Sequence, residues 1–245
     1  IYRTRVSTIW PRLLGWRLIN GLFFCMRSTI HAIINKRKNY LAIYTTEPPF
    51  LPIFGWIISK IFNISYIIIL YDLYPDVLIE LNVLKPSNFI IKLFRFLNYQ
   101  ALKDASEIIV LSKSMAKKLL DINPNLSPRI ISSWADHTQI KPMNKSFNWF
   151  VEENKIQDKF VVLYSGNHGR CHDLETIIRA AKITSMNEKI VYLFIGNGAQ
   201  KSRIQNLSYK LNLKNVIFLP FQENKVLPYS LSAADIAIVS LGDSA

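Results

Sequence analysis

Two hydrophobic periods alternate along the chain. Short runs rich in β-branched residues predict strands near 41–45, 64–71, 107–111, 129–132, 160–165, 190–195, 215–219 and 235–239. Longer stretches with a period of 3.6 residues predict helices near 12–35, 50–62, 87–104, 113–121, 173–186, 199–212 and 224–233. This alternating order predicts an α/β protein whose parallel sheets are covered by helices on both faces.

Residues 52–70 are mostly apolar and admit two interpretations. One is a single transmembrane helix, although Lys60 and Asn63 interrupt the run. The other, which we favour, is a buried helix ending near Phe62 and then a strand, because β-branched residues crowd the second half and Asn63 offers a break.

A polar stretch at 141–146 predicts a domain boundary. We therefore expect two Rossmann-like, doubly wound domains, residues 1–145 and 146–245, that face each other across a cleft. In such sheets a ligand binds beyond the carboxyl ends of the strands.

Positive charge is concentrated in the first domain. The chain carries 30 Lys and Arg against 17 Asp and Glu, and residues 1–150 hold 19 of the basic residues but only 8 of the acidic ones. No acid precedes Glu47, and the basic residues before it are Arg3, Arg5, Arg12, Arg17, Arg27, Lys36, Arg37 and Lys38. Apolar and aromatic residues lie between them, so this region is either an interface with an anionic membrane or a core helix with a solvated basic face.

Other partners and compartments are less consistent with the composition. No basic or aromatic module of the known nucleic-acid folds is present, so nucleic acid is not an expected partner. Cys25 and Cys171 are too few for a disulfide framework and lack the spacing of a zinc site. These features and the absence of a recognisable signal peptide predict a cytoplasmic location.

The most informative motif follows the strand expected at 160–165 and opens a helical pattern. Gly166 and Gly169 allow the backbone to approach a bulky ligand, and Asn167, Arg170 and His172 can donate hydrogen bonds to phosphate oxygens. A diphosphate is the expected occupant. The alternative is a tight strand-to-helix turn with Arg170 in solvent.

Two further strand ends repeat this arrangement. Gly196 and Gly198 follow the strand at 190–195, and Leu219, Pro220 and Phe221 end the strand at 215–219. Pro220 removes a backbone donor and leaves its neighbours free to contact a flat ring. Three consecutive strand ends would then line one cleft, although a simple turn and a strand terminator are the alternatives.

The three motifs together resemble a known family. The segments YSGNHGRCHDLETI, LFIGNGAQ and VIFLPFQENKVLPYSLSAADIAIVSL are similar to the donor-sugar domain of glycosyltransferase family 4, most closely its exopolysaccharide and colanic-acid type members. The similarity extends back through residues 71–76 and 44–49. It implies the GT-B fold, in which two Rossmann-like domains face a cleft and the C-terminal domain holds most of a nucleotide-sugar.

The resemblance implies a metal-independent transfer from a nucleotide-diphosphate sugar, usually with retention at the anomeric carbon and without a cofactor. Gly166, Asn167, Arg170 and His172 would then contact the diphosphate. Many members place an Arg and a Lys in this loop, where Asn167 and His172 stand here, with Arg170 between them.

The other two motifs take their implied roles from the same resemblance. Gly196 and Gly198 would shape the loop beneath the nucleotide. Residues 219–222 would hold its base through backbone contacts.

On the acceptor side, the resemblance implies that Asp72 faces the cleft and orients or polarises an acceptor hydroxyl, with Tyr71 before it and Glu47 as a second cleft residue. An N-cap ahead of Pro75 is an equally good interpretation of Asp72.

The family's paired glutamates would follow Leu241 and its opening Gly-rich loop would precede Ile1, so we expect a chain truncated at both ends. The expected function is sugar transfer to a saccharide or lipid-linked acceptor, in cell-surface polysaccharide synthesis at the inner face of the plasma membrane. The alternatives are a non-catalytic, membrane-associated binding module and, less favoured, a nucleotide-sugar epimerase.

Overall fold

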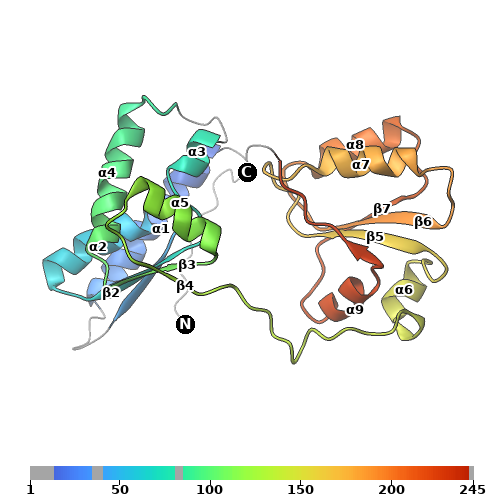
Figure 1. Cartoon of the computed structure of the whole chain (residues 1–245), viewed down its shortest axis with the longest axis horizontal. Coiled ribbons are helices and arrows are strands. Elements are labelled where there is room, and N and C mark those ends of the chain that lie inside the picture. The colour runs from blue at the N-terminus through green and yellow to red at the C-terminus, as the bar shows by residue number, and fades with distance from the viewer. Residues whose placement is uncertain (1–13, 35–40, 81–84, 243–245) are drawn as a thin grey trace. The chain divides into compact units, whose positions relative to one another are not determined.

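The computed structural model describes residues 14–34, 41–80 and 85–242 and divides the chain into two compact units, Ile1–Ser133 and Trp134–Ala245 (Figure 1). The division falls ahead of the boundary that we expected after residue 145. Two contacts explain the difference. The Met143 amide donates to the Ser232 hydroxyl (3.0 Å), and Lys145 Nζ pairs with the Asp235 carboxylate (2.6 Å), so this segment is joined to unit 2.

Unit 1 is a four-stranded parallel sheet with helices between the strands. Its elements are α1 (Leu14–Ile34), β1 (Ala42–Thr45), α2 (Leu51–Phe62), β2 (Tyr66–Leu70), α3 (Asp76–Glu80), α4 (Phe89–Lys103), β3 (Glu107–Val110), α5 (Lys113–Ile122) and β4 (Pro128–Ile130). The strand order is β1-β2-β3-β4. Helix α2 packs against β1, β2 and α4, whereas α5 packs against β3 and β4.

The apolar run at 52–70 is a helix and a strand, as we favoured from the sequence. Helix α2 ends at Phe62 because Asn63 adopts the left-handed conformation (φ 50°, ψ 57°), and its amide closes the helix by donating to Ser59 O. Strand β2 follows, with Ile68 and Leu70 fully buried. None of the helices within residues 14–34, 41–80 and 85–242 combines the length and apolarity needed to cross a bilayer.

Only part of the basic N-terminal run lies within the described residues. Arg27 lies on α1, and Arg17 lies on the same helix, but its side chain is not described. The other basic residues of the run lie outside the described residues: Arg3, Arg5, Arg12, Lys36, Arg37 and Lys38. The sequence-based expectation for this region stays a prediction.

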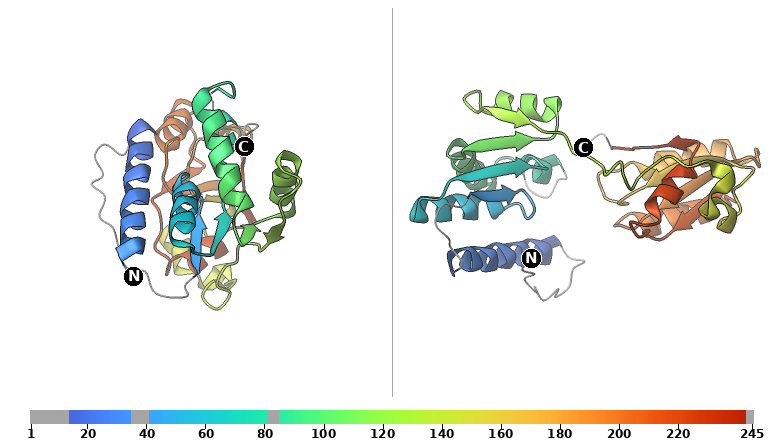
Figure 2. Two further views of the ribbon diagram at one scale, coloured as in Figure 1. Left: turned by 90° about the vertical axis from the view of Figure 1, so that its left-hand side faces the viewer. Right: turned by 90° about the horizontal axis from the view of Figure 1, so that it is seen from below.

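Unit 2 is a second parallel sheet, with strand order β7-β6-β5-β8. Its elements are a 3₁₀ turn (Lys145–Phe147), α6 (Trp149–Glu153), β5 (Phe160–Ser165), α7 (Leu174–Ile183), β6 (Ile190–Ile195), α8 (Lys201–Lys210), β7 (Val216–Leu219), α9 (Leu227–Ser232) and β8 (Ile236–Ala237). Helices α7 and α8 cover one face of the sheet, and α6 and α9 cover the other (Figures 1 and 2).

Both faces of the central strands in unit 2 are buried. Alternate residues of β5 point to opposite sides, so Val161 and Leu163 join the core beneath α6 and α9, while Val162 and Tyr164 join the core beneath α7 and α8. A sheet covered on both faces by helices is the doubly wound arrangement that the sequence predicts. The α/β fold class is confirmed. The short helices α3 and α6 were not predicted, because five residues are too few to show a helical period.

Candidate functional site

The loop after β5 is the centre of the candidate site in unit 2. It runs from Gly166 to the start of α7 and lies against the loop between β6 and α8. The amide of Gly166 donates to Ile195 O and that of His168 to Asn197 O, both at 2.9 Å. In return the Gln200 amide donates to His168 O (2.9 Å). Backbone hydrogen bonds therefore set the spacing of the two loops.

A second segment holds the same loop from its other side. Strand β8 lies next to β5, and the residues after β8 reach the start of α7. The Gly242 amide donates to Cys171 O (2.8 Å), and the Ser240 hydroxyl donates to Asp173 O (2.6 Å). The β5 loop is thus fixed on both flanks.

Two glycines of the β6 loop are required by close approach. Gly196 has φ +140°, and a Cβ on it would lie 1.9 Å from Gly166 O. Gly198 has φ +155°, and a Cβ there would lie 2.5 Å from His168 O. Side chains rarely adopt this conformation, and none would fit in this space. The Gly-x-Gly therefore packs one loop on the other, beyond making a turn.

The start of α7 already carries negative charge. Asp173 caps the helix by accepting a hydrogen bond from the Thr176 amide (3.2 Å), and hydrogen bonds from this turn lower the pKa of its carboxyl. Glu175 lies in the first turn. Because these carboxylates occupy the helix end, an incoming anion depends on donors in the preceding loop.

Arg170 and Asn167 are those donors. Both residues are exposed, and among the described residues no hydrogen bond or ion pair holds the Arg170 guanidinium. Asn167 is positioned through its backbone, because its carbonyl accepts a hydrogen bond from the Tyr164 hydroxyl (2.8 Å). A guanidinium on a fixed loop can make bidentate contacts to a phosphate.

The His172 ring is oriented by the backbone after β8. Its Nδ1 lies 2.8 Å from Ser240 O, and a carbonyl oxygen only accepts, so Nδ1 carries the proton in this contact. In the neutral ring Nε2 then has no proton. His172 can donate to a phosphate through Nε2 only as the imidazolium.

His168 is a residue that sequence reasoning missed. Its ring is fully buried beside Tyr164 and Phe194, and neither ring nitrogen has a hydrogen-bond partner among the described residues. Burial, and after it the charges of Lys201 and His172, lower its pKa, while the nearby backbone of Ile195 has a smaller effect in the other direction. His168 is a neutral packing group beneath the loop.

Lys201 joins the β6 loop to the β7 loop. Its Nζ donates to Gly196 O (2.8 Å) and Leu219 O (3.2 Å), and the Gly196 amide also donates to Leu219 O (3.2 Å). Beyond Leu219, Pro220 is exposed and 69% of the Phe221 side chain is exposed. The three strand ends named from the sequence are therefore adjacent, and Phe221 offers an uncovered aromatic face beside them.

In unit 1 the candidate acceptor residues follow two paired strands. Strands β1 and β2 are in register, and the buried Thr46 hydroxyl accepts hydrogen bonds from the amides of Tyr71 (3.0 Å) and Asp72 (3.2 Å). Glu47 follows Thr46 directly and is exposed, as is Tyr71. Thr46 thus brings together the three residues named from the sequence and was itself missed.

Asp72 is partly buried, and this burial raises the pKa of its carboxyl above the ordinary value. Helix α3 begins only at Asp76, so Asp72 does not occupy its N-cap. The capping interpretation of Asp72 is wrong for this helix. A carboxyl with a raised pKa next to exposed residues is a better candidate for chemistry than for capping.

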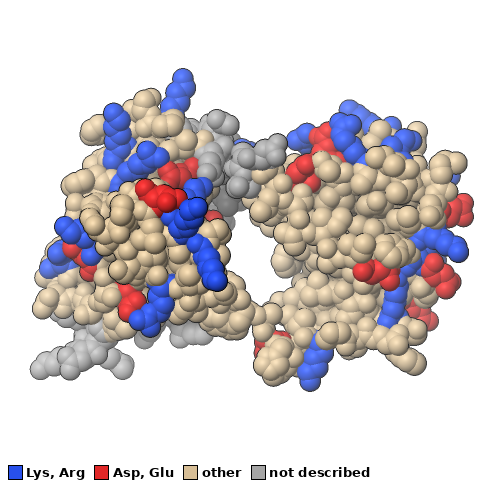
Figure 3. All heavy atoms as spheres, in the orientation of Figure 1, with Lys and Arg blue, Asp and Glu red and all other residues tan. Residues whose placement is uncertain are grey.

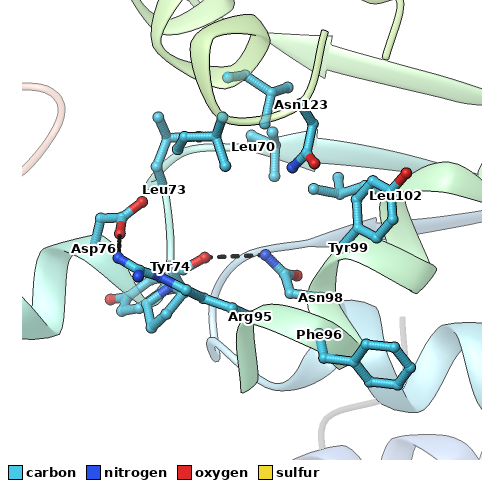
Figure 4. A pocket seen from close by; sticks show the side chains of 13 residues that line it. Leu70, Leu73, Tyr74, Asp76, Arg95, Phe96, Asn98, Tyr99, Leu102 and Asn123 are labelled. Atoms are coloured by element: carbon cyan, nitrogen blue, oxygen red, sulfur yellow. Dashed lines mark hydrogen bonds and ion pairs between the residues drawn. The ribbon is translucent and has the colours of Figure 1, made fainter. Parts of the chain in front are cut away.

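Unit 1 also contains a cavity of about 260 Å³ below the end of β2 (Figure 4). Leucine side chains form much of its wall, including Leu70 and Leu73. At one side an ion pair joins Arg95 to Asp76 (2.6 Å), and Asn98 donates to Tyr74 O (3.0 Å). Sequence reasoning did not find this cavity, because its lining comes from β2, α4 and α5, which are far apart in the sequence.

The part of the chain that the structure describes has no group of three or more His, Cys, Asp or Glu residues arranged to hold a metal ion. The candidate groups on unit 2 are instead the Arg170 guanidinium, the Asn167 amide, the His172 ring and backbone groups. On unit 1 they are carboxyls and a phenol.

Comparison with known proteins agrees with this geometry. Residues 145–242 match the family model for glycosyl transferases group 1. A protein of Pseudomonas aeruginosa named as a probable glycosyltransferase, WbjE, is 23% identical over 229 residues, which cover 92% of this chain and 55% of that protein. A protein of Escherichia coli K12 with the name "putative colanic acid biosynthesis glycosyl transferase WcaI" is 33% identical over 82 residues, which cover 34% of this chain and 20% of that protein.

Among solved structures, Anabaena Alr3699/HepE in complex with UDP-glucose superimposes with a TM-score of 0.65 at 18% identity. The match covers 87% of this chain and 55% of HepE. This likeness establishes the fold, so the GT-B class expected from the sequence is confirmed. The chain spans about half the length of these first relatives.

Proposed function

We propose that this protein is a glycosyltransferase that moves a sugar from a nucleoside-diphosphate donor to a hydroxyl of a saccharide or lipid-linked acceptor. The observation that carries the proposal is the loop after β5, which two neighbouring segments hold while Arg170 and Asn167 remain exposed. The family match over residues 145–242 and the names of the relatives support the same reaction class. The similarity to WcaI supports cell-surface polysaccharide synthesis.

In this reaction the largest change in charge occurs on the leaving diphosphate. The bond between the anomeric carbon and the diphosphate oxygen breaks, its electron pair stays on the diphosphate, and the acceptor oxygen bonds to the carbon and loses its proton. Charge on the diphosphate therefore grows towards the transition state. A guanidinium on a loop whose backbone is already fixed, as at Arg170, lowers the barrier because the charge that it meets on the diphosphate is larger in the transition state than in the ground state.

The remaining unit 2 residues have supporting roles in this proposal. Asn167 donates its amide to the diphosphate, and His172 contributes Nε2 when its ring is charged. Gly196 and Gly198 keep the two loops close beneath the nucleotide, and Gly166 and Gly169 shape the β5 loop itself. The exposed Phe221 and the backbone from Leu219 to Pro220 hold the base.

On unit 1 we assign Asp72 to the acceptor. Its raised pKa makes the carboxylate a better proton acceptor than an ordinary aspartate, and Thr46 fixes the backbone from which it extends. Tyr71 and Glu47 would contact the acceptor. We further propose that transfer occurs with retention and without a metal ion, at the inner face of the plasma membrane, where a lipid-linked acceptor would be presented.

The first test measures nucleotide release from UDP-, GDP- and dTDP-sugars with and without a saccharide acceptor. Arg170→Ala should lower turnover by more than ~10-fold, because a group that stabilises the leaving diphosphate is lost. Lys210→Ala, which removes an equally exposed cation from the far end of α8, is the matched control and should leave turnover unchanged. Equal rates in the two variants would remove Arg170 from the site.

The same assay separates the other interpretations. Transfer requires the acceptor, whereas a nucleotide-sugar epimerase would alter the sugar without one. A binding module would take up a nucleotide-sugar and release no product in either case.

A further inference from the structure

Helix α4 exposes an apolar face instead of a polar one. The exposed fractions of Phe89, Ile90, Leu93 and Phe96 are 75%, 61%, 45% and 58%. Residues 89, 93 and 96 are spaced by four and three, which places them on one side of the helix. Ile91 and other residues on the opposite side are buried in the unit. Helix α4 therefore has two apolar faces, one packed against the rest of unit 1 and one exposed.

Positive charge accompanies this face. The sequence from 85 to 103 contains four basic residues and no acidic one. Lys85 and Lys92 are exposed, while Arg95 is paired with Asp76. Figure 3 shows basic side chains over the unit that carries α4, some of them beside acidic side chains and others surrounded by uncharged surface. Acids adjoin the helix at Asp76, which is paired with Arg95, and at Asp104, which follows its last residue. Aromatic and aliphatic side chains flanked by lysines are typical of a helix that lies in a membrane interface.

Exposed apolar residues in unit 2 differ in their surroundings. Ile183 and Met186, 83% and 92% exposed, lie at the end of α7 with Glu188 close by in sequence. Isolated apolar residues at a helix end are ordinary. They provide a control surface of similar exposure that also has lysines close by, Lys182 and Lys189, but does not form an apolar helix face.

We propose that the N-terminal half of α4 is the surface through which this protein binds an anionic bilayer. Charge complementarity selects this occupant, since Lys85 and Lys92 would meet lipid phosphates while the Phe89, Leu93 and Phe96 side chains enter the boundary between headgroups and acyl chains. The inference rests on the proposed function in one respect, that the acceptor is presented at a membrane. It places the contact on α4, distinct from the basic run at residues 3–38.

The test is sedimentation with vesicles of phosphatidylcholine, alone or with roughly a quarter phosphatidylglycerol, at about 0.1 M salt. The protein should bind only the anionic vesicles, and raising the salt to about 0.5 M should weaken binding several-fold because surface attraction is screened. Phe89→Ser combined with Leu93→Ser should weaken binding at least ~10-fold. The control, Ile183→Ser combined with Met186→Ser, should bind like the unchanged protein.

A charge variant separates the two contributions. Lys85→Gln combined with Lys92→Gln should reduce both affinity and its dependence on salt, whereas Lys210→Gln combined with Lys214→Gln in unit 2 should change neither. Circular dichroism should show the same fold in all variants, because every altered side chain is exposed.

Three results would overturn the inference. Two of them are unchanged vesicle binding in the α4 variants and an equal loss of vesicle binding in the unit 2 controls. The third is a change in the oligomeric state of the α4 variants, measured by light scattering, which would show that a second copy of the chain covers this face. Titration with UDP-glucose in the absence of vesicles keeps the two proposals apart. Donor binding without vesicle binding would refute only the membrane surface, and vesicle binding without binding of any nucleotide-sugar would refute only the proposed reaction.

Discussion

Replacing Gly196 with alanine tests whether the two loops of unit 2 depend on their close approach. The new Cβ would lie 1.9 Å from Gly166 O, so the loops would have to separate by more than about 1 Å to restore a normal contact. That movement would strain the hydrogen bond from the Gly166 amide to Ile195 O (2.9 Å). It would also move the backbone on which Asn167 and Arg170 are carried.

The expected cost has two parts. Holding alanine at φ +140° costs about 1–3 kcal/mol of backbone strain. Forcing a methyl group into a filled space costs about 1–3 kcal/mol more. Gly196→Ala should therefore lower the free energy of unfolding of unit 2 by about 2–6 kcal/mol. Gly166→Ala is the matched control: Gly166 has φ +157°, but a Cβ there meets nothing within 4 Å, so only the first part applies.

Hydrogen exchange of peptides from β5 and β6, measured as a function of urea, reports the stability of unit 2 separately from unit 1. We expect Gly196→Ala to be less stable than Gly166→Ala by about 1–3 kcal/mol and to bind UDP-glucose more weakly. Equal stability of the two variants would refute the argument, because it would show that the space between the loops is not filled.

Two further predictions concern residues that sequence reasoning missed. His168→Leu should raise the free energy of unfolding by about 1 kcal/mol near pH 7, because it removes two buried nitrogens without hydrogen-bond partners. This advantage should grow as the pH falls below about 6.5, because burial lowers the folded-state pKa of His168 and only the unfolded chain then takes up the proton. An advantage that does not depend on pH in urea titrations would contradict this prediction. Thr46→Val should lower the free energy of unfolding by about 1–3 kcal/mol, because the amides of Tyr71 and Asp72 lose their acceptor. Thr46→Ser, which keeps the hydroxyl, should be nearly as stable as the unchanged protein. Equal stability of the two variants in urea titrations would show that the hydroxyl contributes nothing.

Much of the fold follows from local patterns. The strands of unit 2 are recognisable because both of their faces are buried, which makes the runs at 160–165 and 190–195 continuously apolar. The end of α2 could be placed because Asn63 tolerates the left-handed conformation that closes a helix. The start of α7 also has a local signal, because Asp173 stands directly before the helical pattern and its carboxylate accepts the Thr176 amide.

The residues that position the site could not be found in this way. Thr46 acts on amides 25 and 26 residues away, across the pairing of β1 with β2. Lys201 acts on Leu219 O, which reaches it only when β6 and β7 lie side by side. Such contacts depend on tertiary structure and leave no spacing in the sequence. The Gly-x-Gly spacing pointed to Gly196, but the sequence could not show that Gly166 O is the atom a side chain there would meet.

The attachment of the β5 loop through main-chain groups has a consequence for how the protein can change over evolutionary time. Hydrogen bonds involving Gly166, His168 and Cys171 use backbone atoms, which every residue type except proline supplies. The exposed side chains at Asn167 and Arg170 can therefore be exchanged without dismantling the framework that presents them. If the proposed function holds, substitutions at these positions should alter donor preference or rate and leave the scaffold intact, and directed evolution of donor choice can begin at Asn167.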